Sequence, residues 1–185
     1  MKKTILTFGL ISGAIISVLM VANMLFADRL GFSHSYLVGY TTIVLAFLLV
    51  YFGIRSYRDN FGDGRISFGK AFVIGISITL ISTLCYVVTW EILYFKFMPD
   101  FMDKYGAYAV QKLQASGASA AAIQAKDEEI KRYKVLEDNP LTNAAMTFIE
   151  PFPVGLLVSL ISAAILRRRP NPTTQSSQSP ATATN

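Results

Sequence analysis

Four long runs of apolar residues, separated by polar stretches, constrain this chain more than any other feature. The runs cover residues 4–26, 36–54, 71–95 and 143–166. Each is about 20 residues long or longer, which is the length that a helix needs to cross the hydrocarbon core of a bilayer. Lipid offers no hydrogen-bond partner to the backbone, so an open chain crosses it only as helices. The runs also lack the alternation of barrel strands. The sequence therefore predicts an all-α membrane protein with four transmembrane helices.

The composition excludes several other classes of protein. Hydrophobic residues make up 52% of the chain and charged residues 16%, against about 25% charged residues in an ordinary soluble domain. These values argue against a soluble enzyme, a nucleic-acid-binding domain and a disordered protein. The single cysteine and single histidine exclude an internal disulfide framework, a cysteine-rich zinc site and a metal site of the HExxH type. We therefore expect no metal, no cofactor and no nucleic-acid partner.

The placement of basic residues predicts the orientation of the chain. Lys2 and Lys3 precede the first run, residues 55–70 hold four basic residues, residues 167–169 are arginines, and the 27–35 loop holds Arg29 alone. Basic residues in short loops favour the cytoplasmic side. Both termini and the 55–70 loop are therefore expected in the cytoplasm, and residues 27–35 and 96–142 outside. An alternative for the first run is a cleaved signal peptide, although the run is much longer than the roughly 7–15 apolar residues of one.

Residues 97–139, between the third and fourth runs, carry a helical pattern of their own. Pro99 suits the first turn of a helix, and apolar residues then recur at helical spacing. Ser116 and Gly117 interrupt the pattern, and Ser119 can cap a second helix. We expect a bent helix or a helical hairpin outside the membrane. Its apolar face would cover the mouth of the bundle, lie on lipid headgroups or pair with another copy.

The membrane domain is expected to span residues 1–169. Residues 170–185 hold only Ser, Thr, Gln, Pro, Asn and Ala. A stretch without apolar anchors cannot form a packed core, so we expect a disordered polar tail.

Two glutamates, Glu91 and Glu150, stand alone in otherwise apolar runs. An ionisable residue in a membrane segment is costly, and by default it is a functional candidate. At about 1.5 Å of rise per residue, both lie in the outer half of the membrane, as do Asn23 and Thr41 on the first two helices. We therefore predict a candidate intramembrane polar site of Glu91, Glu150, Asn23 and Thr41, and no catalytic, cofactor-binding or metal-binding residues.

Two arrangements of the glutamates remain open. In the first, Glu91 and Glu150 face the bundle interior and share one pocket, beside a kink caused by the two prolines that follow Glu150. In the second, both are structural. Glu91 then extends toward Lys96 at the membrane surface, and Glu150 pairs with Arg29 or bonds to Asn143.

Small residues form a stripe on the first helix and another on the fourth. The stripes consist of Gly9, Gly13 and Ser17, and of Gly155, Ser159 and Ala163. Such stripes let a second helix approach closely in a membrane. They predict helix packing within the monomer, with dimerisation as the alternative.

Five short strings resemble, in combination, a known family: Ser56–Asp59, Ile66–Phe72, Thr89–Ile92, Met98–Phe101 and Phe152–Gly155. Over about residues 2–169 the chain resembles an uncharacterised family of small bacterial membrane proteins, domain-of-unknown-function family 4199, found mainly in Bacteroidetes-type bacteria. The resemblance implies a multi-spanning bacterial membrane protein and supplies no activity and no catalytic residues. The polar tail departs from the pattern.

These observations favour a non-enzymatic, multi-pass protein of a bacterial inner membrane. We expect a structural, assembly or partner-binding role, because no nucleophile–base pair accompanies the glutamates. The alternative is a small transport or sensing protein with a carboxylate-lined proton or cation site. The expected partners are the lipid bilayer and either a second copy of the chain or another membrane protein.

Cysteine labelling of intact cells tests the predicted orientation. With Cys85 replaced by alanine, a cysteine at Ser119 should react with a membrane-impermeant maleimide, because the 96–142 segment is expected outside. A cysteine at Ser176 should react only after the cells are permeabilised. The reverse pattern would contradict the orientation, and labelling at both positions would indicate an odd number of spans.

Overall fold

The computed structural model describes the backbone of residues 1–30 and 32–168, and the side chains of residues 1–25 and 37–168. Within these residues the chain forms the helices α1 (Lys2–Leu30), α2 (Phe32–Phe61), α3 (Phe68–Ile92), η1 (Leu93–Phe97), α4 (Phe101–Ala115), α5 (Ala120–Glu137), α6 (Pro140–Ile149) and α7 (Phe152–Leu166). The predicted all-α class is confirmed for this part of the chain. The expected tail at 170–185 and the pairing of Glu150 with Arg29 lie outside the described residues.

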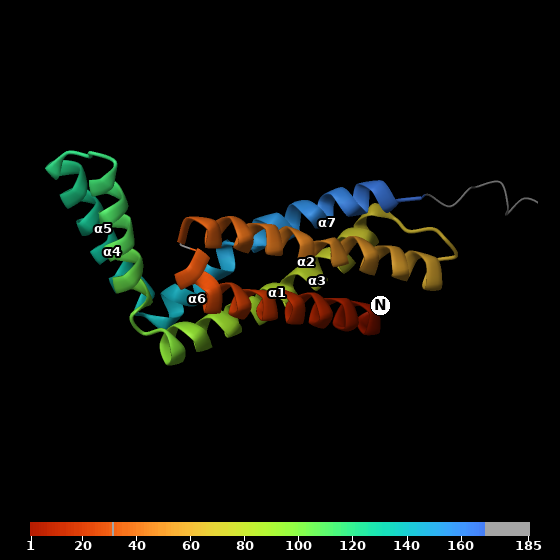
Figure 1. Ribbon diagram of the computed structural model, residues 1–185. Helices are drawn as coiled ribbons and strands as arrows, with labels where there is room; N and C mark the ends of the chain where they lie inside the picture. Colours follow the sequence, from red (N-terminus) through yellow and green to blue (C-terminus); the bar gives the residue numbers. More distant parts are fainter. Residues whose placement is uncertain (31, 169–185) are drawn as a thin grey trace, which may run out of the picture.

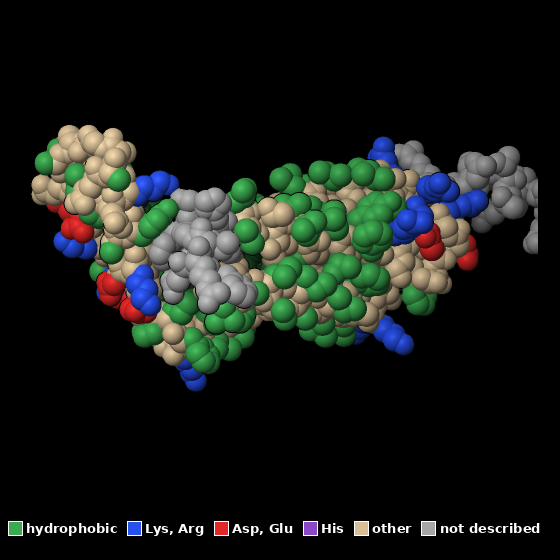
Figure 2. Space-filling view, viewed as in Figure 1, with side chains coloured by type: hydrophobic (Ala, Val, Ile, Leu, Met, Phe, Trp, Pro, Cys, Tyr) green, Lys and Arg blue, Asp and Glu red, His purple; other side chains and the backbone are tan. Residues whose placement is uncertain are grey.

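Four helical stretches are long and apolar enough to cross a membrane, as the sequence predicts. They are Lys2–Leu25, Leu37–Phe61, Phe68–Phe97 and Pro140–Leu166. Figure 1 shows α1, α2, α3 and α7 lying side by side as a bundle. Hydrophobic side chains cover the visible face of the bundle, and charged side chains gather toward its two ends (Figure 2). These features fit a multi-pass membrane protein.

The fourth span consists of two helices rather than one. α6 ends at Ile149 with Glu150 as its C-cap, and α7 begins directly after Pro151. Pro151 and Pro153 lack the backbone N–H that would continue the helical hydrogen bonds to the preceding turn. The kink predicted beside Glu150 is therefore present in the structure.

A helical hairpin formed by α4 and α5 projects steeply from one end of the bundle (Figure 1). Its break lies where the sequence predicts it, because Gly117 has a φ of +75°. The Ser119 hydroxyl accepts a hydrogen bond from the Ala122 N–H at 3.3 Å and so caps α5. The two helices approach closely at Gly106, where an added Cβ would lie 2.9 Å from Ile130 Cγ2. The segment is helical, and its place outside the membrane stays a prediction.

A small apolar cluster attaches the hairpin to the bundle. It consists of Tyr94 in η1, Met102 in α4 and Ile130 in α5, all of them buried. The Tyr94 hydroxyl also donates a hydrogen bond to Asp138 Oδ1 at 3.2 Å, just beyond the end of α5. The end of the third span therefore holds both helices of the hairpin.

Small residues bring α3 close to its neighbours α1 and α7. An added Cβ at Gly13 of α1 would lie 2.7 Å from Cys85 Sγ. Gly155 of α7 meets the methyl group of Thr79 so closely that a Cβ would clash with it. The Thr79 hydroxyl also lies 3.1 Å from the Ser159 hydroxyl, within hydrogen-bond distance. The stripes predicted from the sequence thus serve helix packing within the monomer.

Gly155→Ala should destabilise the bundle by about 1–3 kcal/mol, the usual cost of overpacking a core, because its methyl group would clash with Thr79. Gly69→Ala is the matched control. An added Cβ at Gly69 meets no atom within 4 Å, so this change should be neutral or slightly stabilising. Unfolding of the purified proteins in mixed detergent micelles measures both effects. Equal stabilities of the two variants would contradict the close contact between α3 and α7.

Candidate functional site

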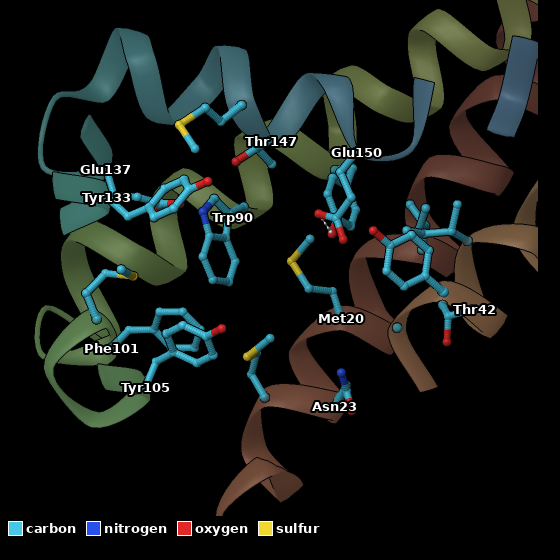
Figure 3. Close-up of a pocket in the computed structure, with 18 of the residues that line it drawn as sticks. Met20, Asn23, Thr42, Trp90, Phe101, Tyr105, Tyr133, Glu137, Thr147 and Glu150 are labelled. Carbon is cyan, nitrogen blue, oxygen red and sulfur yellow. Dashed lines mark hydrogen bonds between the residues drawn. The ribbon is translucent and has the colours of Figure 1, made fainter. Parts of the chain in front are cut away.

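A cavity of about 590 Å³ lies between the end of the helix bundle and the α4–α5 hairpin. Residues of α1, α2, α3 and α6 wall it from the bundle, and residues of α4 and α5 wall it from the hairpin. Figure 3 shows Trp90, Phe101 and Tyr105 on one side of the open space, with Met20 and Asn23 of α1 across from them. The volume falls in the range of about 300–1,000 Å³ that is typical of small-molecule sites.

Aromatic and methionine side chains contribute ten of the 22 described residues that line the cavity. The aromatic residues are Tyr40, Tyr86, Trp90, Phe101, Tyr105 and Tyr133, and the methionines are Met20, Met24, Met102 and Met146. Trp90 meets Phe101 edge to face, with 5.2 Å between ring centroids. Phe101 stacks on Tyr105 at 6.5 Å. The wall is therefore largely apolar and polarisable.

Glu150 reaches the cavity from the break between α6 and α7. The Tyr86 hydroxyl of α3 donates a hydrogen bond to Glu150 Oε2 at 2.9 Å (Figure 3). No lysine, arginine or histidine pairs with this carboxylate among the described side chains. Among the described side chains, an ionised Glu150 therefore has a neutral hydrogen-bond donor and no counter-ion.

Glu137, the last residue of α5, brings a second carboxylate to the cavity. Asn143 Nδ2 donates hydrogen bonds to Glu137 Oε2 and to the Glu137 backbone carbonyl, both at 3.0 Å. The Thr147 hydroxyl in turn donates to Asn143 Oδ1 at 3.2 Å. Burial raises the pKa of Glu137 above its ordinary value, and the negative charges of Glu150 and Glu91 raise it further. The cavity thus holds a second carboxylate, and the negative charge of Glu150 disfavours its ionisation.

The remaining charges of the described lining balance one another. Lys126 Nζ lies 3.0 Å from Glu129 Oε1, which is the distance of an ion pair. Glu137 and Glu150 therefore carry the uncompensated charge of the described wall. No three His, Cys, Asp or Glu side chains in the described part of the chain are grouped so that they could hold a metal ion.

Two of the four residues predicted as a polar site line this cavity. Glu150 and Asn23 do so, and Asn23 is buried, with 8% of its surface exposed. Thr41 lies outside, because its side chain is exposed and donates a hydrogen bond to the Leu37 carbonyl at 2.8 Å. The next residue, Thr42, lines the cavity in its place.

Glu91 is not among the residues that line the cavity, although Trp90 beside it is. Adjacent residues point about 100° apart around a helix, so the two cannot share one direction. Glu91 Oε1 is buried and has no hydrogen-bond partner within the described residues. It also forms no ion pair with Lys96 there. The cavity therefore includes Glu150 without Glu91.

Glu137 and the aromatic residues of the hairpin were not predicted as site residues. In the sequence, Tyr105 and Tyr133 belong to the apolar pattern of the 97–139 segment, and Glu137 is one of the charged residues of that segment. One expectation from the sequence could have identified these residues. If the apolar face of the 97–139 segment covers the mouth of the bundle, its side chains also line any space that is enclosed there.

Glu137→Gln should flatten the pH dependence of stability. A carboxyl group whose pKa is raised by folding binds its proton more tightly in the folded state. The fold therefore loses stability as the pH rises from the ordinary pKa of 4.5, which applies to the unfolded chain, through the raised pKa of Glu137 in the folded protein. Below this range the wild type and the variant should unfold alike, and above it the variant should be at least as stable, because glutamine keeps the acceptor for Asn143.

Thermal unfolding in detergent between about pH 4 and pH 8 measures this effect. Glu128→Gln is the control, since Glu128 is exposed on α5. A wild type that gains stability over Glu137→Gln as the pH rises would contradict the raised pKa.

Comparisons with known proteins identify the family of this chain. The family model described as "Protein of unknown function (DUF4199)" matches residues 7–168. No curated protein and no solved structure matches the chain. The matched range reaches from the first span to the last and includes the hairpin that closes the cavity. The chain therefore belongs to the DUF4199 family of proteins of unknown function.

Proposed function

We propose that this protein is a non-enzymatic binding protein of the bacterial inner membrane, whose cavity takes a small ligand or a side group of a partner. The observation that carries the proposal is the cavity of about 590 Å³, walled jointly by the bundle and the hairpin. A mostly apolar pocket with a few convergent polar groups is the usual form of a binding site.

The polar groups of the cavity favour binding over catalysis. Glu150 is held by the Tyr86 hydroxyl, and Glu137 is held by Asn143. The described lining holds no serine, cysteine or histidine, which are the commonest nucleophiles and bases of enzymes. The carboxylates are therefore placed to attract a ligand.

The packing next to the cavity favours binding over transport. Ile16 and Ile43 line the cavity and are almost completely buried, and Phe47 and Ile78 continue the apolar core of the bundle. These side chains pack against one another next to the cavity, which fits a closed-ended pocket better than a passage. A ligand that touches both the bundle and the hairpin would stabilise the hairpin in this position, which suits a sensing role.

We propose that the termini are cytoplasmic and that the cavity opens on the outer side. The start of α1, the turn between α2 and α3 and the end of α7 lie at the end of the bundle away from the hairpin (Figure 1). Lysine and arginine side chains gather at that end (Figure 2), which supports this orientation. Lipid would cover the apolar flanks, with a second copy or another membrane protein as a further partner.

Gly39→Phe tests the binding role by filling the cavity. Gly39 lines the cavity, and an added Cβ there would meet Asn23 Nδ2 at 3.8 Å, which is an ordinary contact. The first side-chain carbon therefore fits without a clash with the described residues, and a phenyl ring at this position of the lining should occupy part of the cavity. Gly69→Phe is the matched control, because an added Cβ at Gly69 meets nothing within 4 Å.

Each tagged protein is purified from its native membrane in mild detergent, and the small molecules and proteins that it retains are identified by mass spectrometry. We expect species that are held by the wild type and by Gly69→Phe to be lost from Gly39→Phe. The same set of retained species with all three proteins would contradict a binding role for the cavity.

A further inference from the structure

We propose that the cavity selects amphiphilic organic cations, which are molecules that join a positively charged nitrogen to an apolar body. This inference rests on the proposed binding role of the cavity and names the class of its ligand. Three properties of the described lining carry it: the balance of charge, the aromatic surface and the shortage of metal-type ligands.

The first property is an unbalanced negative charge. Glu137 accepts a hydrogen bond from Asn143 at 3.0 Å, and Glu150 accepts one from Tyr86 at 2.9 Å. Both donors are neutral, and the lysine of the described lining is already paired with Glu129. A cation entering the cavity therefore meets two carboxylates that have no counter-ion among the described side chains, whereas an anion is repelled by both.

The second property is a contiguous aromatic surface. Trp90, Phe101 and Tyr105 are in contact through one edge-to-face pair and one stacked pair. The faces of such rings attract organic cations, and tryptophan does so most strongly. Met20 lies across the open space from this surface (Figure 3), and methionine side chains adapt to apolar bodies of different shapes.

The third property argues against an inorganic cation. Calcium takes about 6–8 oxygen ligands, and magnesium requires a near-octahedral set. The lining is instead mostly aromatic and aliphatic, and the described side chains offer no group of three metal ligands. An organic cation uses both the carboxylates and the apolar wall of a cavity of about 590 Å³.

Trp90 reports directly on the occupancy of the cavity, because it is the only tryptophan in the chain and it lines the cavity. The full chain in an uncharged maltoside detergent is titrated with a bromoalkyl-trimethylammonium, and separately with the bromoalkyl alcohol of the same chain length. Bromine quenches tryptophan fluorescence on contact. Gly39→Phe keeps Trp90 and therefore measures the quenching by probe that is merely dissolved in the micelle.

We expect the ammonium to bind the wild type at least about tenfold more tightly than the alcohol. Glu150→Gln should weaken ammonium binding by about tenfold and leave alcohol binding within about twofold, because it removes a charge and keeps an acceptor for Tyr86. Glu137→Gln should act in the same direction. Glu128→Gln removes the same charge from an exposed position and should change neither affinity.

Several outcomes would overturn the inference. The inference is wrong if Glu150→Gln and Glu137→Gln both keep the full preference of the wild type for the ammonium probe over the alcohol probe. If Glu150→Gln does not fold, Glu137→Gln alone provides this test. Equal quenching of the wild type by both probes, above the Gly39→Phe background, would refute cation selection while supporting the binding role. The inference is also wrong if neither probe quenches the wild type more strongly than it quenches Gly39→Phe. The proposed binding role is tested separately, by the species that the protein retains from native membranes.

A lipid with an amine headgroup offers the same chemistry as a free amphiphilic amine. Adding phosphatidylethanolamine to the micelles, with phosphatidylglycerol as the control lipid, separates these two sources. Competition by phosphatidylethanolamine alone would identify the ligand as an aminolipid. Unchanged ammonium affinity would identify it as a free amphiphile, and both results support the proposed class.

Discussion

The bundle depends on the close approach of α3 to α1 and α7 at residues that have almost no side chain. Lipid tails are as apolar as leucine, so membrane helices associate through van der Waals contact and hydrogen bonds. Gly13 on α1 and Gly155 on α7 allow this approach, and larger residues there would collide with α3. Toward the hairpin, the residues between the same helices become Met20, Tyr86 and Trp90. The cavity lies where this change from small to large side chains occurs.

Both interruptions of regular helix in the spans lie close to the cavity. The π-helical segment η1 carries Tyr94, which anchors the hairpin, and the break after α6 places Glu150 in the wall. π-Helical turns and prolines commonly occur where a helix must present particular groups. Here η1 lies between α3 and α4, at the point where the chain passes from the bundle into the hairpin. The second interruption brings a carboxylate to the space that the hairpin encloses.

The charge of the cavity connects its stability to its occupancy. A carboxylate taken partly out of water without a counter-ion is unfavourable even when a neutral group donates a hydrogen bond to it. A bound cation would offset part of this cost, and a ligand that binds only the folded form stabilises it. Because Glu137 belongs to the hairpin and Glu150 to the bundle, such a ligand would also strengthen the contact between these two parts.

The sequence by itself determined the four spans, the kink after Glu150, the break in the hairpin and the small-residue stripes. Each depends on a local property: the length of an apolar run, the loss of a backbone donor at proline, capping by Ser119, or side-chain size. Only the tertiary structure decided which polar residues meet. It placed Thr42 in the cavity instead of Thr41, and it joined Glu137 to Glu150 without Glu91. Sequence gives the depth of a residue along a helix, but the direction of its side chain changes by about 100° per residue. That direction, and the docking of the hairpin, are set by contacts between segments that are far apart in the chain.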